Sequence, residues 1–339
     1  MKKINLSGEQ NADYFGYKKI LEQEGFKLGK GLKVPLEKEV GGKAVENHFH
    51  YKDTGFPIGF FRVLLNKYFS RPVRQMSLRR HRILLRDILE QMTGQKHKNY
   101  WPNGKKAAFC LRIDVDFPLR YFYLRKKILQ ALVDFKKDLD AMEIKASLFL
   151  NLDYLSEAKV VKKVFADHDI QLHGCSKRVP HRRYGYDLHR ISYRELYQML
   201  SWGKKMTGAS IFAPPCEHVD SRVLEICENL GFEAVSAGHL GKDDIPYKCY
   251  LGREFNLLNI PTSSVELLEK VPLSYYLREF DSVVQDESLF CIYFHPIMLL
   301  KYKEKILALL KQVKQIEKEK KVWITTQKEL VEWWKERGY

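Results

Sequence analysis

The chain has 339 residues, 45% hydrophobic and 13% aromatic, so it can bury a sizeable core and is not a disordered chain. Lys and Arg outnumber Asp and Glu by 58 to 42, and the formal net charge of +16 favours anionic partners. The apolar runs are too short to cross a bilayer, and the first residues lack the apolar region of a secretory signal. These features predict a cytoplasmic protein. The six scattered cysteines form no CxxC pair, which argues against a disulfide framework.

Residues 1–100 are predicted to be a mixed N-terminal extension whose fold the pattern does not define. Within residues 60–92, apolar residues recur at helical spacing, and arginines occupy much of the remaining surface, at Arg79, Arg80, Arg82 and Arg86. Such a helix either packs on its own domain with a solvated basic face or rests on an anionic membrane surface, which would place the protein at the inner face of the membrane. Without a zinc-finger spacing, an RNP-like motif or a basic tail, nucleic acid is not expected as a partner.

From residue 107 onward, predicted strands and helices alternate. Turn residues at 102–104 separate this part from the extension. The expected strands cover 107–113, 145–150, 170–174, 209–214, 232–238, 256–261, 288–296 and 321–326. The expected helices cover 119–142, 156–168 with a Ser156 N-cap, 191–208, 220–231, 301–321 and 326–338. This succession indicates parallel βαβ units and an α/β fold, closed into a barrel or a barrel-like sheet.

In such barrels the chemistry lies at the carboxyl ends of the strands. The first strand ends in Asp114 and Asp116, and side chains two residues apart on a strand point the same way. Two like charges held close together need a metal, a proton or a cation between them. His173 and His295 end two later strands. Carboxylates and imidazoles at one rim form a ligand set for a divalent metal that keeps a position open for water.

The order of these features resembles the polysaccharide deacetylases, the NodB-homology superfamily of carbohydrate esterases. The segment "LRIDVD" is most similar to the branch that contains the deformylase of a lipid-linked aminoarabinose. The resemblance implies a distorted (β/α) barrel over residues 107–337. It implies hydrolysis of a linear amide C–N bond, which releases an acetyl or formyl group from an amino-sugar glycan or a lipid-linked sugar. It also implies Asp114 as general base, Asp116 and His173 as ligands of a divalent metal such as zinc, and His295 as general acid.

Two motifs depart from that family. Its second motif has another histidine four residues after the first, where this chain has Lys177. The nearest replacement is His181, or Cys175 if the loop turns differently. An ammonium group at Lys177 could also offset the charges of Asp114 and Asp116 without any metal. The barrel would then be catalytically silent and would bind a carbohydrate or a protein partner.

The third motif of the resemblance lies on "FAPPCEHVD". Ala213 stands where many members have an arginine that orients the base, and Cys216 stands where an aromatic residue is common. A backbone N–H in the Pro215–Cys216 loop is expected to stabilise the oxyanion. Beside the hydrolase and the silent barrel, a protein that binds an anionic surface or nucleic acid through its charge is the third hypothesis.

Overall fold

The computed structural model describes residues 4–5, 28–33, 99–117, 123–174, 188, 191–217, 219–238, 245–262, 271–319 and 321–338. The chain divides into two compact units, Met1–Lys98 and Asn99–Tyr339. In the first unit, β1 (Ile4–Asn5) pairs in parallel with β2 (Leu28–Lys33). The basic helix predicted within residues 60–92 lies outside the described residues. The second unit carries all the candidate site residues that the structure describes.

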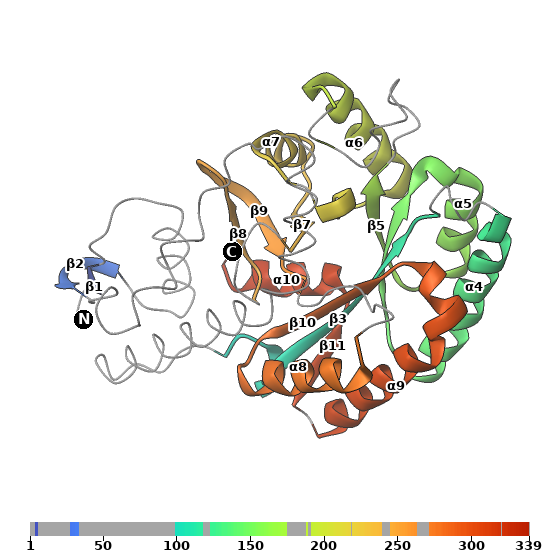
Figure 1. Cartoon of the computed structure of the whole chain (residues 1–339). Coiled ribbons are helices and arrows are strands. Elements are labelled where there is room, and N and C mark those ends of the chain that lie inside the picture. The colour runs from blue at the N-terminus through green and yellow to red at the C-terminus, as the bar shows by residue number, and fades with distance from the viewer. Residues whose placement is uncertain are drawn as a thin grey trace. The chain divides into compact units, whose positions relative to one another are not determined.

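The second unit is built on a nine-stranded sheet in the order β10-β3-β4-β5-β6-β7-β9-β8, with β11 paired to β3 (Figure 1). The strands are β3 (Ala107–Val115), β4 (Ser147–Asn151), β5 (Asp169–Gly174), β6 (Ile211–Phe212), β7 (Ala234–Ser236), β8 (Tyr247–Tyr250), β9 (Glu254–Ile260), β10 (Leu289–Phe294) and β11 (Val322–Thr325). All neighbours are parallel except the β8–β9 hairpin. Within the described residues no pairing joins β10 to β8, so the barrel is distorted and incompletely closed.

Strand β3 occupies the centre of this arrangement because it has three partners. One edge pairs with β10, from Ala108 to Ile113. On the other edge, the first half of β3 pairs with β11 and the second half, from Arg112 to Val115, pairs with β4. Strand β3 is therefore flanked on both edges along almost its whole length.

Helices alternate with the strands, and all of the described α-helices except α8 lie where the sequence predicts one. They are α4 (Arg125–Ala141), α5 (Leu155–Val164), α6 (Tyr193–Thr207), α7 (Ser221–Asn229), α8 (Leu273–Gln285), α9 (Leu299–Lys318) and α10 (Gln327–Glu336). Single turns of 3-10 helix lie at η2 (Pro102–Gly104), η4 (Leu152–Tyr154), η8 (Pro215–Glu217) and η9 (Pro296–Met298). The predicted Ser156 N-cap is wrong: α5 begins one residue earlier, and its N-cap, Tyr154, makes no side-chain cap bond. None of the helices that the structure describes has both the length and the apolar character of a membrane span.

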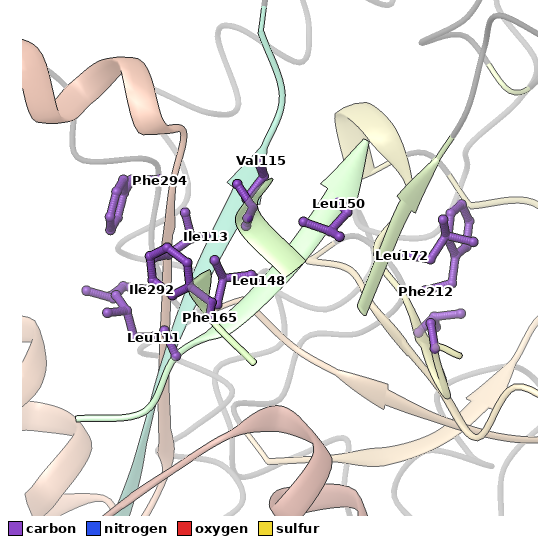
Figure 2. Close-up of a cluster of buried hydrophobic side chains, with 14 of the residues drawn as sticks. Leu111, Ile113, Val115, Leu148, Leu150, Phe165, Leu172, Phe212, Ile292 and Phe294 are labelled. Atoms are coloured by element: carbon purple, nitrogen blue, oxygen red, sulfur yellow. The ribbon is translucent and has the colours of Figure 1, made fainter. Parts of the chain in front are cut away.

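Side chains of β3 alternate between two apolar clusters. Leu111, Ile113 and Val115 face the outer cluster between the sheet and its helices, beside side chains of β4 and β10 (Figure 2). Ala108 and Cys110 belong instead to a second cluster inside the barrel. That inner cluster includes Trp101 and Trp334 of α10, whose ring centroids lie 5.3 Å apart. By the period of two, Arg112 and Asp114 follow on the same inner face, toward the carboxyl ends of the strands.

Helix α6 has a complete N-terminal capping box, which supports a local stability prediction. Ser192 accepts a hydrogen bond from the Glu195 N–H, and the Glu195 side chain accepts one from the Ser192 N–H. Replacing Ser192 with alanine is expected to lower the free energy of unfolding by about 1 kcal/mol, because the first turn loses its acceptor. Urea denaturation would measure this loss. The Ser192→Asp variant keeps an acceptor and should retain most of the stability; an equal loss in both variants would contradict the capping role.

Candidate active site

Three of the predicted side chains come together at the carboxyl ends of the strands. Ligand atoms of Asp114, His173 and His295 all lie within 4.8 Å of one another. Asp114 belongs to β3 and His173 to β5, while His295 follows β10 directly. Asp114 and His173 are buried, and the side chain of His295 is one quarter exposed. A solvent-derived group could therefore reach the cluster from the side of His295.

The tautomer of His173 is fixed by the loop after β6. Its Nδ1 lies 2.8 Å from the carbonyl oxygen of Ala213. A carbonyl can only accept, so Nδ1 carries the hydrogen and Nε2 of the neutral ring keeps its lone pair. Burial lowers the pKa of His173, although Asp114 and Asp116 act in the opposite direction. A neutral imidazole whose second nitrogen donates to a backbone carbonyl is the usual state of a metal-ligating histidine.

Arg112 is the site residue that the sequence analysis missed. It is 1% exposed, and its Nε and Nη2 each donate to one oxygen of Asp114 at 2.7 Å. Its Nη1 donates to the carbonyl oxygen of Ser236 at 3.0 Å, at the end of β7. The guanidinium thus links β3 to a strand four places away in the sheet. A single arginine among buried apolar residues, two positions before Asp114, is the sequence signal for this role.

Aromatic rings complete the surroundings of Arg112. The guanidinium carbon lies 5.2 Å from the ring centroid of Phe149 on β4 and 5.1 Å from that of Tyr293 on β10, which are cation–π distances. Burial by itself would raise the pKa of Asp114, but Arg112 and the neighbouring histidines hold that pKa below its usual range. Asp114 is therefore ionised at neutral pH. The cation beside it is Arg112, supplied from the same strand.

Asp116 adjoins the cluster through His295. Its N–H donates to the carbonyl oxygen of Asp114 at 2.9 Å, which turns the chain as β3 ends. One carboxylate oxygen of Asp116 lies 3.7 Å from Nε2 of His295. The two aspartates consequently have different partners: Arg112 engages Asp114, and His295 lies beside Asp116.

The loop after β6 contains the predicted oxyanion donor. Pro215 has no N–H, and the N–H of Glu217 donates to the carbonyl oxygen of Pro214 at 2.9 Å. Among the described residues of this loop, the donor that remains is therefore the Cys216 amide. A Cβ atom on Gly174 would lie 3.4 Å from the Pro215 ring, so the loop packs against the end of β5, beside His173. Lys177, His181 and Cys175 lie outside the described residues.

A second cluster of acidic residues and a histidine, Asp140, Asp167 and His168, has the spacing of a metal site but the wrong chemistry. Nδ1 of His168 accepts a hydrogen bond from the Ala146 N–H at 3.1 Å, so Nε2 of the neutral ring carries the proton. Burial lowers the pKa of His168 and keeps that ring neutral. Lysines already pair with both aspartates, at Lys136 and Lys145. This cluster is therefore a structural network.

Comparison with known proteins identifies the fold. No protein-family model and no curated protein sequence matches the chain. Among solved structures, a protein assigned as a polysaccharide deacetylase from Mycobacterium smegmatis is 15% identical with a TM-score of 0.53, over 68% of this chain and 91% of that one. One from Pseudomonas aeruginosa PAO1, also assigned as a polysaccharide deacetylase, is 13% identical with a TM-score of 0.54, over 71% and 95%. An allantoinase is 14% identical with a TM-score of 0.56, over 71% and 94%. The predicted barrel of the polysaccharide deacetylase type is confirmed, and the fold leaves the substrate open.

Proposed function

Since the chain has the fold of the polysaccharide deacetylases, we propose that it is a metal-dependent hydrolase that removes an N-acyl group from an amino sugar. The observation that carries this proposal is the meeting of Asp114, His173 and His295 at the carboxyl ends of the strands. Asp114 is ionised, and His173 presents a lone pair, as a metal-assisted hydrolysis requires. The bond attacked would be the amide C–N bond of an acetylated or formylated amino group.

The donor set fits a divalent ion such as zinc. Nε2 of His173 would be one ligand, and a carboxylate the second. Both oxygens of Asp114 accept hydrogen bonds from Arg112, whose positive charge weakens that carboxylate as a ligand. We therefore assign the ligand role to Asp116 and leave the third ligand to His181, outside the described residues. When bound, the ion would supply a water of lowered pKa and polarise the acyl carbonyl.

The remaining steps belong to side chains and backbone of this chain. Asp114 takes the proton of the attacking water, oriented by its two bonds to Arg112. The Cys216 amide donates to the oxygen on which negative charge develops. His295, the most exposed member of the cluster, gives a proton to the departing amine. Base and acid thus come from adjacent strands, β3 and β10.

One observation favours a second candidate function. Arg112 neutralises Asp114 without any metal, so this carboxylate needs no metal ion as its counter-charge. A catalytically silent barrel that binds a carbohydrate or a protein partner would have this property. The hydrolase remains the proposal because the His173 tautomer has no use in a silent barrel beyond its single hydrogen bond.

Metal content separates the two functions. The purified protein is expected to hold about one equivalent of a divalent metal by elemental analysis, because Asp116, His173 and His181 would supply the three protein ligands of such a site. The His173→Ala variant should lose it. The matched control is His168→Asn, which keeps an acceptor in place of Nδ1 and should retain the metal. Wild-type protein that stays metal-free after incubation with zinc, cobalt or nickel would favour the silent barrel.

We further predict that the group removed is an acetyl or formyl group and that its carrier is an amino-sugar glycan or a lipid-linked sugar. Acetate and formate release from N-acetyl and N-formyl amino sugars, free and lipid-linked, would identify the substrate. The membrane contact through residues 60–92 and the inner-face location remain predictions, since those residues lie outside the described ones.

A further inference from the structure

We propose that Glu217 is a positioning residue of this site: locked by Thr262, it fixes the loop after β6 that orients His173 and presents the Cys216 amide. This inference rests on the proposed function and adds a residue to it. The lock joins the loops that follow β6 and β9, through a hydrogen bond from Thr262 Oγ1 to Glu217 Oε1 of 2.8 Å.

The backbone of Glu217 is the first observation. Its φ of +56° is in the left-handed region, which L-residues avoid. Among the described residues, three other non-glycine residues share this conformation. Asn103 and Glu143 are exposed turn residues, and Glu287 is a half-buried one. Glu217 is 6% exposed and adjoins a candidate active site. Strain of this kind persists where surrounding contacts hold the residue in place, and at Glu217 the buried contacts of the carboxylate do so.

The fit around the carboxylate is the second observation. Gly238, in the loop after β7, leaves the space that the Glu217–Thr262 pair fills. A Cβ atom there would lie 2.5 Å from Thr262 Oγ1 and 3.0 Å from Glu217 Oε2. Thr262 is also buried. The loops that follow β6, β7 and β9, three neighbouring strands of the sheet, therefore meet at the Glu217 carboxylate.

The loop connects this lock to the catalytic residues. Within five residues, the carbonyl oxygen of Ala213 accepts the His173 Nδ1–H, Pro215 packs on Gly174, and Glu217 anchors the far end. Burial lowers the pKa of Arg112, whereas the Asp114 carboxylate, and to a smaller extent that of Glu217, raises it. The net pKa of Arg112 lies above its usual value. Glu217 thus acts on the site both through the backbone and through charge. Releasing it would loosen the acceptor that sets the His173 tautomer.

The first test removes the donor of the lock. The Thr262→Val variant is expected to lower kcat about tenfold with little change in KM, and Thr262→Ser should restore it, because only the serine keeps the hydroxyl. Hydrogen–deuterium exchange of the 211–217 amides, measured without substrate, should rise in the valine variant alone. Equal exchange and equal kcat in the two variants would overturn the proposal.

The second test uses a matched pair of left-handed glutamates. Glu217→Gly and Glu143→Gly relieve the same backbone strain at φ values of +56° and +54°. Glu217→Gly should unfold at a lower urea concentration than Glu143→Gly, because it also removes the buried bond to Thr262, and it alone should lose kcat and gain exchange in residues 211–217. A loss of stability confined to Glu217→Gly, with kcat unchanged, would show a purely structural latch and overturn the positioning role.

The third test separates this inference from the proposed function. Gly238→Ala places a methyl group against the lock without requiring a left-handed backbone, so it should reproduce the exchange pattern of Thr262→Val. Zinc binding by the apoprotein, measured by competition with a chromophoric chelator, should weaken about tenfold in both variants because the acceptor of His173 moves. If the wild type binds zinc but releases no acyl group, the hydrolase proposal fails while weakened zinc binding still supports the lock. Unchanged zinc binding and exchange in both variants would overturn the lock, whether or not the wild type is active.

Discussion

Replacing Arg112 with methionine is expected to lower the free energy of unfolding by about 3–5 kcal/mol, because it leaves the buried Asp114 carboxylate without its cation. Methionine keeps the contact with Phe149 and Tyr293 on either side, so little of the loss would come from packing. The effect is large because both oxygens of Asp114 bond to this guanidinium inside the barrel. Urea denaturation at pH 7 is the measurement.

Two further variants isolate the charge pair. Arg112→Met combined with Asp114→Leu should recover most of the lost stability, since an apolar pair of similar volume leaves no unpaired charge. Lys136→Met removes the cation of a pair near the surface, 2.6 Å from Asp140, and should change stability by less than about 1 kcal/mol. A double variant as unstable as Arg112→Met would show that Arg112 stabilises the barrel by something other than this pair.

The same pair predicts opposite pH responses of the wild type and the variant. The folded-state pKa of Asp114 is lowered, so its contribution is present above the unfolded pKa of about 3.9 and is lost as pH falls through the folded pKa. Without Arg112, the remaining burial raises the pKa of Asp114 above the unfolded value. The variant should then gain stability relative to the wild type as pH falls from 7 toward 4. Melting temperatures across that range would check the sign, and a constant difference would contradict it.

Replacing His295 with asparagine is expected to lower kcat by about 10²–10⁴-fold, the usual contribution of a general acid. Stability should change little, because the side chain is one quarter exposed and its neighbour Asp116 is 3.7 Å away. Initial rates of acyl release beside a urea denaturation curve would measure both quantities. This variant tests the chemistry more cleanly than Asp114→Asn, which also leaves Arg112 buried beside a neutral amide.

The result is compared with Ser192→Ala, which replaces the N-cap of α6 and no member of the cluster, and should keep full activity. A His295→Asn variant that retains more than about a tenth of the wild-type rate would assign the proton donor to another residue. A leaving group that needs no proton, such as an activated aryl amide, should rescue much of the lost rate if His295 is the acid.

The barrel could be predicted because its signals are local. Apolar runs bounded by turn residues place most of the strands, and the period of two along β3 puts Asp114 on the inner face. The predicted helices match closely for α6, which begins after Ser192 and ends before a left-handed Gly208. Helix α8 was missed although it buries Tyr276, Phe280 and Val283 at helical spacing, and β8 was missed because it is a short antiparallel strand.

The electrostatics of the site could not be predicted, because they depend on which strands become neighbours. Arg112 meets Ser236 only after the sheet has curled, across 124 positions of sequence. The sequence therefore suggests Lys177, a residue in the expected motif position, as the counter-charge, whereas the cation that pairs with Asp114 comes from the strand itself. The role of Glu217 was hidden in the same way, since Thr262 and Gly238 come from later loops.

The pairing of β3 with β10 and β11 has a consequence for synthesis on the ribosome. The strand that carries Arg112 and Asp114 is the first of the nine-stranded sheet to be made, but both of its edges are completed by strands from residues 289–325. Until those residues leave the exit tunnel, β3 exposes an unpaired edge and a charge pair without its enclosing walls. Pairings this distant in sequence form slowly, so this part of the sheet is expected to fold late and cooperatively. The cluster of Asp114, His173 and His295 is thus completed only after β10 has been made, around the first strand of the nine-stranded sheet.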